Sequence, residues 1–201
     1  SDQNPRFHSK CSSIFQTREC FSLTPQIMYF HIISEHGGIY IDNDILALKS
    51  IEPLRHYDHT QGIGLHGDGL SNGAIIAKKE SILFNLWIEA YRTYKTFGKS
   101  DIRNNIRLWG YYSIHIPRML LTIYPHLVHI ESQTLIKPKP SVYMDKRRIK
   151  YVWENNYSIH VWQRLLTVPD SPEKIPDLPS ESLLRQAMEY IWFDRKPLDM
   201  A

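Results

Sequence analysis

One short run constrains this chain more than any other part of its 201 residues. It is Gly37-Gly38-Ile39-Tyr40-Ile41-Asp42-Asn43-Asp44, an apolar segment that ends in two carboxylates one residue apart. Successive side chains of a strand point to opposite faces, so the pattern predicts that Asp42 and Asp44 face the same way where a buried strand ends.

The residues before this run predict a helix. Thr24 is a suitable N-cap and Pro25 suits the first helical position, where its missing N–H costs nothing. Gly37 supplies the left-handed residue that closes such a helix, and Gly38 allows the chain to turn at once into the strand. The apolar side chains at helical spacing are those of Ile27, Phe30 and Ile33.

The acidic pair is flanked by apolar residues on both sides, because Ile45-Leu46-Ala47-Leu48 follows it directly. Two charges in such a place are unfavourable without a counter-ion. A hard divalent cation takes one or two protein carboxylates and fills its other positions with water and phosphate oxygens. The spacing therefore predicts a metal–diphosphate site, while a solvated turn is the ordinary alternative for an isolated Asp-x-Asp.

The remaining chain predicts strands that alternate with helices, which indicates an α/β sandwich. In open α/β sheets ligands bind at the carboxyl ends of the strands, where the acidic pair is expected. A Pro-rich stretch at 169–179 interrupts regular structure. The predicted helices are 81–97, 115–124 and 180–193, and the predicted strands are a Gly-rich strand and loop at 62–72, then 127–130 and 157–162.

Composition excludes some functions. A net charge of +3 is too small to indicate nucleic-acid binding. No segment has the ~20 consecutive apolar residues of a membrane span. Basic residues gather between 137 and 150, where a solvated loop is the favoured interpretation and a flap that neutralises a diphosphate or meets anionic lipid is the alternative. The members of this group are Lys137, Lys139, Lys146, Arg147, Arg148 and Lys150.

Three motifs carry a resemblance to a known family. The run HGGIYIDNDILALKSIEPL resembles the DXD region of glycosyltransferases with a GT-A-like fold. Two looser matches follow in the same order, Leu70–Ala77 and then Tyr157–Trp162 with its His-x-Trp. The groups most similar are outer-chain α-mannosyltransferases, α-1,4-galactosyltransferases and α-1,4-N-acetylglucosaminyltransferases. Together the motifs cover residues 20 to 163.

The resemblance implies a GT-A-like, Rossmann-like sandwich that binds a nucleotide diphosphate sugar. It implies transfer of a hexose or N-acetylhexosamine to a glycan or glycolipid hydroxyl with retention of configuration. UDP-sugar is the favoured donor and GDP-mannose the alternative. The implied metal is Mn²⁺ or Mg²⁺, held by Asp42, Asp44 and His160, which are also the expected catalytic residues.

The same resemblance implies a set of donor-binding residues. Asn72 is expected to contact the sugar, although a turn residue explains it equally well. His160 is a candidate metal ligand or a hydrogen-bond donor to the diphosphate. The ordinary interpretation of a histidine in such an apolar strand is a core residue. For Trp162, packing is favoured over stacking on the sugar. The expected donor-side set is Gly37, Gly38, Tyr40, Asp42, Asn72 and Trp162.

The predicted organisation is a partial glycosyltransferase domain at 1–165, followed by a Pro-rich linker and C-terminal helix at 166–201. Only about two dozen loop-like residues precede the first motif helix, so we expect the chain to lack the first strand or two of the domain. Eukaryotic relatives are type II membrane proteins of the Golgi lumen, which implies an anchor upstream of this chain. A disulfide between Cys11 and Cys20 and two free thiols are equally consistent with the sequence.

Some positions differ from the family pattern. Family members carry Ser-Asp and then Arg on the helix before Gly-Gly, where this chain has Pro25, Gln26 and Tyr29. The alternative function is therefore a non-catalytic transferase-like domain that binds sugar or a partner protein. A metal-dependent phosphohydrolase is a second alternative, but it normally requires a further acidic cluster, and none is evident in the sequence.

Overall fold

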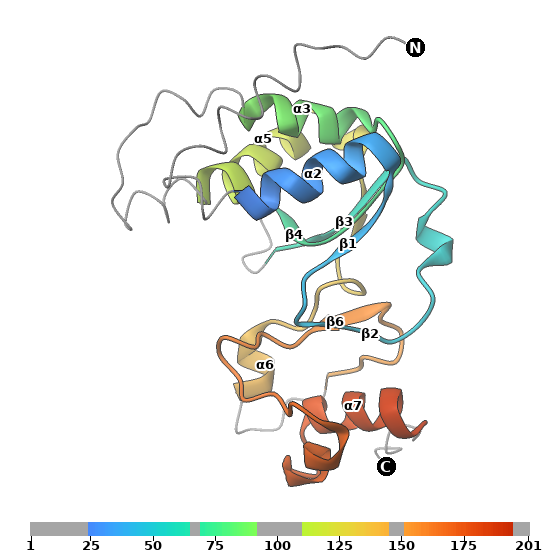
Figure 1. The fold of residues 1–201 in the computed structure, drawn as a ribbon, viewed down its shortest axis with the longest axis vertical. Helices are drawn as coiled ribbons and strands as arrows, with labels where there is room; N and C mark the ends of the chain where they lie inside the picture. The colour runs from blue at the N-terminus through green and yellow to red at the C-terminus, as the bar shows by residue number, and fades with distance from the viewer. Residues whose placement is uncertain (1–23, 65–68, 92–109, 145–150, 195–201) are drawn as a thin grey trace.

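The computed structural model describes residues 24–64, 69–91, 110–144 and 151–194. Their strands form two sheets, a larger one beneath a layer of helices and a smaller one in the part of the molecule that carries the last helix (Figure 1). The chain passes from the first sheet to the second directly after its first strand, within the acidic run (Figure 1).

The larger sheet has four strands in the order β1-β4-β3-β5. These are β1 (Gly38–Ile41), β3 (His59–Ile63), β4 (Leu70–Ala77) and β5 (His129–Glu131). Strand β4 is antiparallel to β1 and β3, and β3 is parallel to β5. Strands β1, β3 and β5 therefore run in one direction, and their carboxyl ends lie at the same end of the sheet.

One face of this sheet is covered by α2 (Thr24–His36), α3 (Ile82–Tyr91) and α5 (Ile116–Ile123), the last preceded by the π-helical η4 (Tyr111–His115) (Figure 1). Aromatic side chains fill the space between them. Phe30 contacts Phe84 and Trp87, with ring centroids 4.7 Å and 4.6 Å apart. The buried members of this core are Phe30, Ile33, Ile75, Ala77, Phe84, Trp87, Tyr91, Tyr112 and Ile116.

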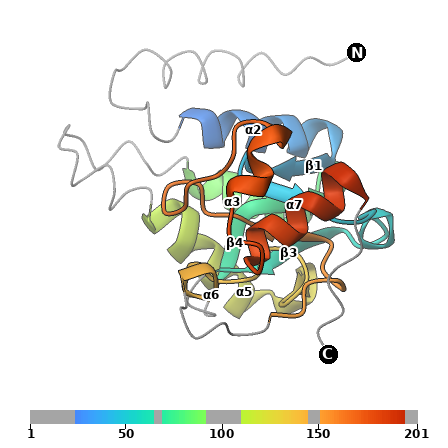
Figure 2. The same cartoon turned by 90° about the horizontal axis from the view of Figure 1, so that it is seen from below.

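The smaller sheet pairs β2 (Ile45–Ala47) with β6 (Ser158–His160) in antiparallel register. Helices α6 (Pro140–Met144) and α7 (Leu183–Phe193) and the 3₁₀ segment η6 (Pro172–Asp177) lie around it, and α7 faces the viewer in Figure 2. Ser182 caps α7, because its hydroxyl accepts a hydrogen bond from the Arg185 amide at 3.2 Å. The core here consists of Trp153, Ile159, Val161, Ile175, Leu184, Ala187 and Met188.

The mixed α/β architecture agrees with the predicted fold class, and several predicted elements are present. Gly37 adopts φ +69° and its amide donates to the Ile33 carbonyl at 2.7 Å, as predicted for a left-handed helix end. The predicted strand at 127–130 is wrong by two residues, because Pro125–Leu127 form the 3₁₀ turn η5 and β5 starts at His129. Helix α3 ends at Tyr91, and the rest of the predicted helix at 81–97 lies outside the described residues.

The prediction that β1 is buried is wrong. Ile39 and Ile41 are 47% and 48% exposed, because β1 is the edge strand of the described sheet. Within the described ranges, no helix is long and apolar enough to cross a membrane. The expectations about residues 1–20, Cys11 and Cys20 fall outside the part of the chain that the structure describes.

Candidate metal centre

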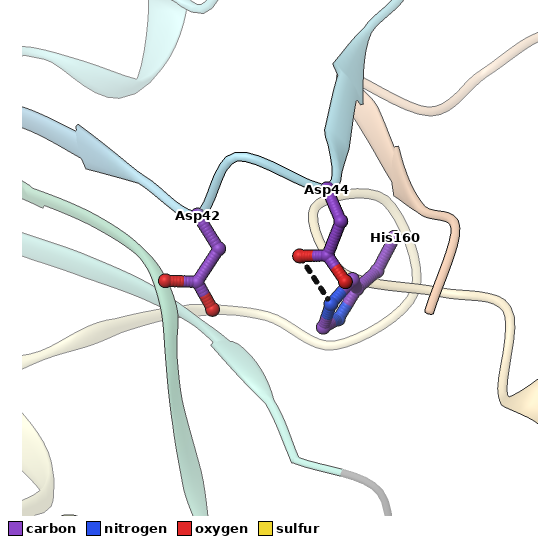
Figure 3. A group of neighbouring side chains, drawn as sticks. All are labelled: Asp42, Asp44 and His160. Carbon is purple, nitrogen blue, oxygen red and sulfur yellow. Dashed lines mark ion pairs between the residues drawn. The ribbon is translucent and has the colours of Figure 1, made fainter. Parts of the chain in front are cut away.

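Three side chains from two distant parts of the sequence meet where the two sheets join. Asp42, Asp44 and His160 each place a potential ligand atom within 4.8 Å of the other two (Figure 3). Asp42 follows β1 of the larger sheet, whereas His160 ends β6 of the smaller sheet. The group lies at the carboxyl end of β1, which is the end of the sheet where the sequence predicts a ligand.

The two aspartates converge through a turn and not through strand alternation. Strand β1 ends at Ile41, and Asn43 and Asp44 form a turn before β2 begins at Ile45. The Ile45 amide closes this turn on the Asp42 carbonyl at 3.2 Å. The alternation argument is therefore wrong, because the chain leaves the first sheet after Asp42 in order to enter the second.

Pairing within the smaller sheet brings His160 to Asp44. Ile45 lies opposite His160 in the β2–β6 register. The Asp44 carbonyl accepts a hydrogen bond from the Val161 amide at 2.9 Å. Consequently, His160 Nε2 lies 3.0 Å from Asp44 Oδ1, the contact drawn in Figure 3. The Gln163 amide donates to the other carboxylate oxygen of Asp44 at 3.1 Å.

Asp42 is held in a half-buried position. Its amide donates to the Gly73 carbonyl at 2.7 Å, and the Tyr40 hydroxyl donates to its Oδ1 at 2.7 Å. Burial raises the pKa of the Asp42 carboxyl, the hydrogen bond from Tyr40 and the nearby His160 lower it, and the charge of Asp44 raises it. Desolvation is the largest cause of the raised Asp42 pKa. A bound cation would offset this cost, because it would stabilise the buried carboxylate in its charged form.

The imidazole of His160 is fixed by stacking. Its ring lies 3.8 Å from that of Trp162, with 26° between their planes. Trp162 has φ +55°, and its indole N–H donates to the Pro138 carbonyl at 3.0 Å. His160 is 7% exposed, and its Nδ1 is buried without a hydrogen-bond partner. Trp162 thus packs on a member of the site, and its stacking on a sugar stays a prediction.

The three ligand atoms, which lie within 4.8 Å of one another, are almost close enough to share one divalent cation. Two ligands at about 2.2 Å from one ion are at most about 4.4 Å apart, so a small rotation of the side chains would bring all three into range. Two carboxylates suit Mg²⁺ and Mn²⁺ alike, whereas the imidazole nitrogen favours Mn²⁺ over the harder Mg²⁺. Among the described residues no other group of three potential ligands is found.

Two of the predicted donor-binding residues are not close to this group. Gly37 and Gly38 lie at the amino end of β1, opposite the end that leads to Asp42. An alanine Cβ at Gly37 would lie 2.6 Å from the Lys79 amide nitrogen, so a close approach of backbones accounts for this glycine. Asn72, in contrast, is half-buried on β4 next to Gly73, whose carbonyl accepts a hydrogen bond from the Asp42 amide, and its side chain hydrogen-bonds with the Tyr29 hydroxyl. Contact of these residues with a donor stays a prediction.

The sequence did not indicate a role for Gly73, and it predicted the wrong environment for Lys137. An alanine Cβ at Gly73 would lie 3.2 Å from Asp42 Oδ2, so this glycine leaves space for the carboxylate. Lys137 is buried, and its ammonium donates to the carbonyls of Gly64 at 3.2 Å and Ile63 at 3.4 Å. Burial lowers the pKa of the Lys137 ammonium. The solvated-loop interpretation is thus wrong for Lys137, while 145–150 lie outside the described residues.

The chain shows limited similarity to known proteins. No protein-family profile matches it. It is 26% identical over 147 residues to a protein named glucan organizing enzyme 1 from Cryptococcus neoformans var. grubii serotype A. The similar segment is 64% of this chain and 37% of that relative, so the chain matches just over a third of the relative's length. No solved structure matches.

Proposed function

We propose that this chain carries the metal-dependent donor site of a glycosyltransferase. The observation that carries the proposal is the group of Asp42, Asp44 and His160, whose ligand atoms lie within 4.8 Å of one another at the carboxyl end of a strand. The similarity to a protein named glucan organizing enzyme 1 supports a role in glycan chemistry. The DXD resemblance supports a GT-A-like fold and transfer of a hexose or N-acetylhexosamine from a nucleotide diphosphate sugar.

The proposed role of each residue follows from its environment. Asp44 and His160 would hold Mn²⁺, or Mg²⁺, together with Asp42. When bound, this cation would stabilise the negative charge that the diphosphate gains as the sugar departs. Tyr40 orients the Asp42 carboxylate through its hydroxyl, at 2.7 Å. Trp162 holds the imidazole plane of His160 by stacking.

Substrates and location rest on the resemblance alone. We propose a UDP-sugar as donor, with GDP-mannose as the alternative, and a glycan or glycolipid hydroxyl as acceptor. The same resemblance suggests the Golgi lumen. The relative's name supports only the glycan part of this proposal.

A non-catalytic donor-binding domain is the second candidate, and one observation favours it. Tyr29 takes the position where family members carry an arginine, and it stacks on Tyr40 at 3.6 Å. Burial raises the pKa of the Tyr29 hydroxyl, so a neutral, apolar contact replaces a cation next to Tyr40 and Asp42. Metal-dependent donor binding without transfer to an acceptor would identify this function.

Calorimetric titration of UDP and then GDP, with and without Mn²⁺, tests the proposal. We expect one nucleotide to bind only when Mn²⁺ is present, because a cation held by Asp42, Asp44 and His160 would supply the positive charge that attracts a diphosphate. Asp44→Asn removes the charge at nearly constant volume and should weaken this binding by at least roughly tenfold. Asp170→Asn, at an exposed carboxylate in another part of the chain, is the matched control and should bind as the unaltered protein does.

The outcomes separate the candidates. Metal-dependent binding that Asp44→Asn abolishes supports the donor site, and hydrolysis or transfer of the matching nucleotide sugar then distinguishes an enzyme from a binding domain. If neither nucleotide binds in the presence of Mn²⁺, or if Asp44→Asn binds normally, the proposed donor site is wrong.

A further inference from the structure

A stacked pair of tyrosines joins helix α2 to strand β1 beside the candidate metal centre. The rings of Tyr29 and Tyr40 lie 3.6 Å apart, with 12° between their planes. Tyr29 precedes Phe30, which is 1% exposed and anchors α2 in the aromatic core that the helices form over the sheet (Figure 1). The position of α2 therefore fixes Tyr29, and Tyr29 in turn limits where the ring of Tyr40 can lie.

Each tyrosine hydroxyl has a single proton to donate. Burial raises the pKa of both hydroxyls, so both are neutral at pH 7. The Tyr40 hydroxyl donates its proton to Asp42 Oδ1, at 2.7 Å. The oxygen of Tyr40 is left as an acceptor, and the Tyr29 hydroxyl hydrogen-bonds to it. The proton of Tyr29 is thereby used as well, so the Tyr29 oxygen can only accept.

Asn72 on β4 supplies the donor that Tyr29 requires. Its side chain hydrogen-bonds with the Tyr29 hydroxyl, and an amide side chain offers both an NH₂ donor and a carbonyl acceptor. Because Tyr29 has no second proton, the NH₂ group of Asn72 faces it. Donation therefore runs from Asn72 to Tyr29, from Tyr29 to Tyr40 and from Tyr40 to Asp42. All three hydrogen bonds point the same way, an arrangement in which each bond strengthens the next.

Strand β4 also holds the main chain of Asp42. Asn72 is followed by Gly73, whose carbonyl accepts a hydrogen bond from the Asp42 amide at 2.7 Å. An alanine Cβ at Gly73 would lie 3.2 Å from Asp42 Oδ2, so β4 borders this oxygen as well. Adjacent residues of β4 thus act on Asp42 by two routes, directly through the backbone of Gly73 and indirectly through the side chain of Asn72.

We propose that Tyr29 and Asn72 are positioning residues for the metal centre, which act on Asp42 through the Tyr40 hydroxyl. In this role neither side chain touches the cation. The assignment rests on the metal site of the proposed function, and it applies equally to a transferase and to a non-catalytic donor-binding domain, since both would use the metal. It also gives Asn72 a role other than the expected contact with the sugar.

Calorimetric titration of Mn²⁺ alone into the whole chain tests these roles. Tyr40→Phe removes the hydroxyl that orients the Asp42 carboxylate and should weaken Mn²⁺ binding at least roughly tenfold. Tyr29→Phe keeps the stacked ring but removes the hydrogen bond to Tyr40, and it should weaken Mn²⁺ binding at least roughly threefold. Because Tyr29 acts only through Tyr40, the variant with both changes should bind Mn²⁺ as Tyr40→Phe does. A role in packing alone would change the melting temperature and leave Mn²⁺ affinity unaltered.

Asn72→Leu removes the first donor at similar side-chain volume. It should weaken Mn²⁺ binding as much as Tyr29→Phe does, and it should cause no further loss when Tyr29 is already replaced. The matched control is Tyr91→Phe, which removes a hydroxyl from the same aromatic core and should bind Mn²⁺ as the unaltered chain does. A thermal melt of each variant distinguishes loss of the fold from loss of the site.

Nuclear magnetic resonance of the unaltered protein gives a second measurement that needs no variant to bind metal. With ¹³C in the tyrosine rings and Mg²⁺ as a diamagnetic cation, the resonances of Tyr29 and Tyr40 should shift on metal binding. Those of Tyr91 should stay unchanged, because its ring stacks on Tyr112 at 4.6 Å and not on Tyr40.

The outcomes separate this proposal from the proposed function. Unchanged Mn²⁺ affinity in Tyr29→Phe, a loss that adds to that of Tyr40→Phe, or an equal loss in Tyr91→Phe would overturn it. An Asn72→Leu chain that binds Mn²⁺ normally but binds a nucleotide sugar more weakly would overturn the role given to Asn72. If the unaltered chain binds no Mn²⁺, the metal centre itself is wrong, and the positioning roles are wrong with it. If Mn²⁺ binds and neither UDP nor GDP does, the donor site is wrong while the Mn²⁺ titrations still decide the positioning roles.

Discussion

At the scale of single residues, the Asp42 carboxylate depends on its neighbours for its position. Tyr40 holds one oxygen by a hydrogen bond, and the absence of a side chain at Gly73 leaves room for the other. The main chain contributes too, since the Asp42 amide is bonded to the Gly73 carbonyl. Gly73 therefore shapes the site without offering a ligand atom.

Gly73→Ala is expected to weaken the site while preserving the fold. Its Cβ would lie 3.2 Å from Asp42 Oδ2 and 3.6 Å from Cδ1 of Ile136, so the carboxylate must shift by a few tenths of an ångström. Displacing a ligand in this way costs roughly tenfold in metal affinity. The measurement is calorimetric titration of Mn²⁺ with saturating UDP, beside a thermal melt.

Gly64→Ala is the control for this change. Its Cβ would meet only the carbonyl oxygens of Gly69 at 3.4 Å and Leu70 at 3.9 Å, which are ordinary contacts. Equal metal affinity in Gly73→Ala and the unaltered chain would show that Gly73 does not set the position of Asp42.

At the scale of elements, the junction between α2 and β1 sets the direction of β1, the strand that ends just before Asp42. Gly37 has φ +69°, and its amide caps the helix at the Ile33 carbonyl. It also packs against the backbone of Lys78 and Lys79, at the end of β4. The helix, the turn and two strands therefore meet at one residue.

Gly37→Ala is expected to lower the free energy of unfolding by at least about 2 kcal/mol. A left-handed conformation costs an alanine about 1–2 kcal/mol, and the added Cβ would lie 2.6 Å from the Lys79 amide nitrogen. Urea unfolding measures the change. Gly110→Ala is the matched control, because Gly110 has a helical φ of −57° and its Cβ would have no atom within 4 Å.

The control should be neutral or stabilising by up to about 1 kcal/mol, since alanine is the better helix former. A Gly37→Ala protein that is as stable as the Gly110→Ala protein would contradict the assigned role of Gly37.

At the scale of the whole molecule, one buried polar chain ties the sheet to the helical layer. His59 on β3 contacts the Ser81 hydroxyl at 3.4 Å, at the start of α3, and the Gln61 carbonyl oxygen at 2.7 Å. The Gln61 amide group donates to the Ser71 carbonyl at 2.8 Å, which fixes the side-chain orientation of Gln61. His59 Nε2 is therefore the donor to Gln61, and burial, which lowers the pKa of His59, keeps this histidine neutral at pH 7.

The stability of the fold should consequently decrease with acid in a defined range. Burial lowers the pKa of His59 from 6.5 to about 4. The unfolded chain therefore binds more protons between these values, and stability that is complete above about pH 7 is lost as the pH falls from 6.5 towards 4. This pKa shift of His59 corresponds to at most about 3 kcal/mol in the free energy of unfolding. Roughly 2–3 kcal/mol of that stability is lost when the pH reaches 4.5.

Urea unfolding at pH 7.0 and 4.5 measures this loss. His59→Gln cannot titrate and should show a smaller difference between the two pH values by roughly that amount. His126→Gln, at an exposed histidine, should retain the full difference. Identical pH dependence in His59→Gln and His126→Gln would refute the assignment.

The sequence by itself determined the local features. The apolar helix, its end at Gly37, the acidic pair and the mixed α/β class follow from spacing and turn chemistry, which act over a few residues. His160 became a candidate only through its resemblance to a family motif, because nothing near it in the sequence indicates that it would meet Asp44. Metal binding at this group stays a prediction.

Only the tertiary structure decided how these parts meet. The β2–β6 pairing brings His160 to Asp44 across more than a hundred residues, and the turn at Asn43 and Asp44 replaces the expected alternation on one strand. The exposure of β1, the space at Gly73 and the burial of Lys137 likewise depend on neighbours distant in sequence. Local patterns fix which segments can form strands and turns, whereas pairing and packing between distant segments fix which side chains face one another.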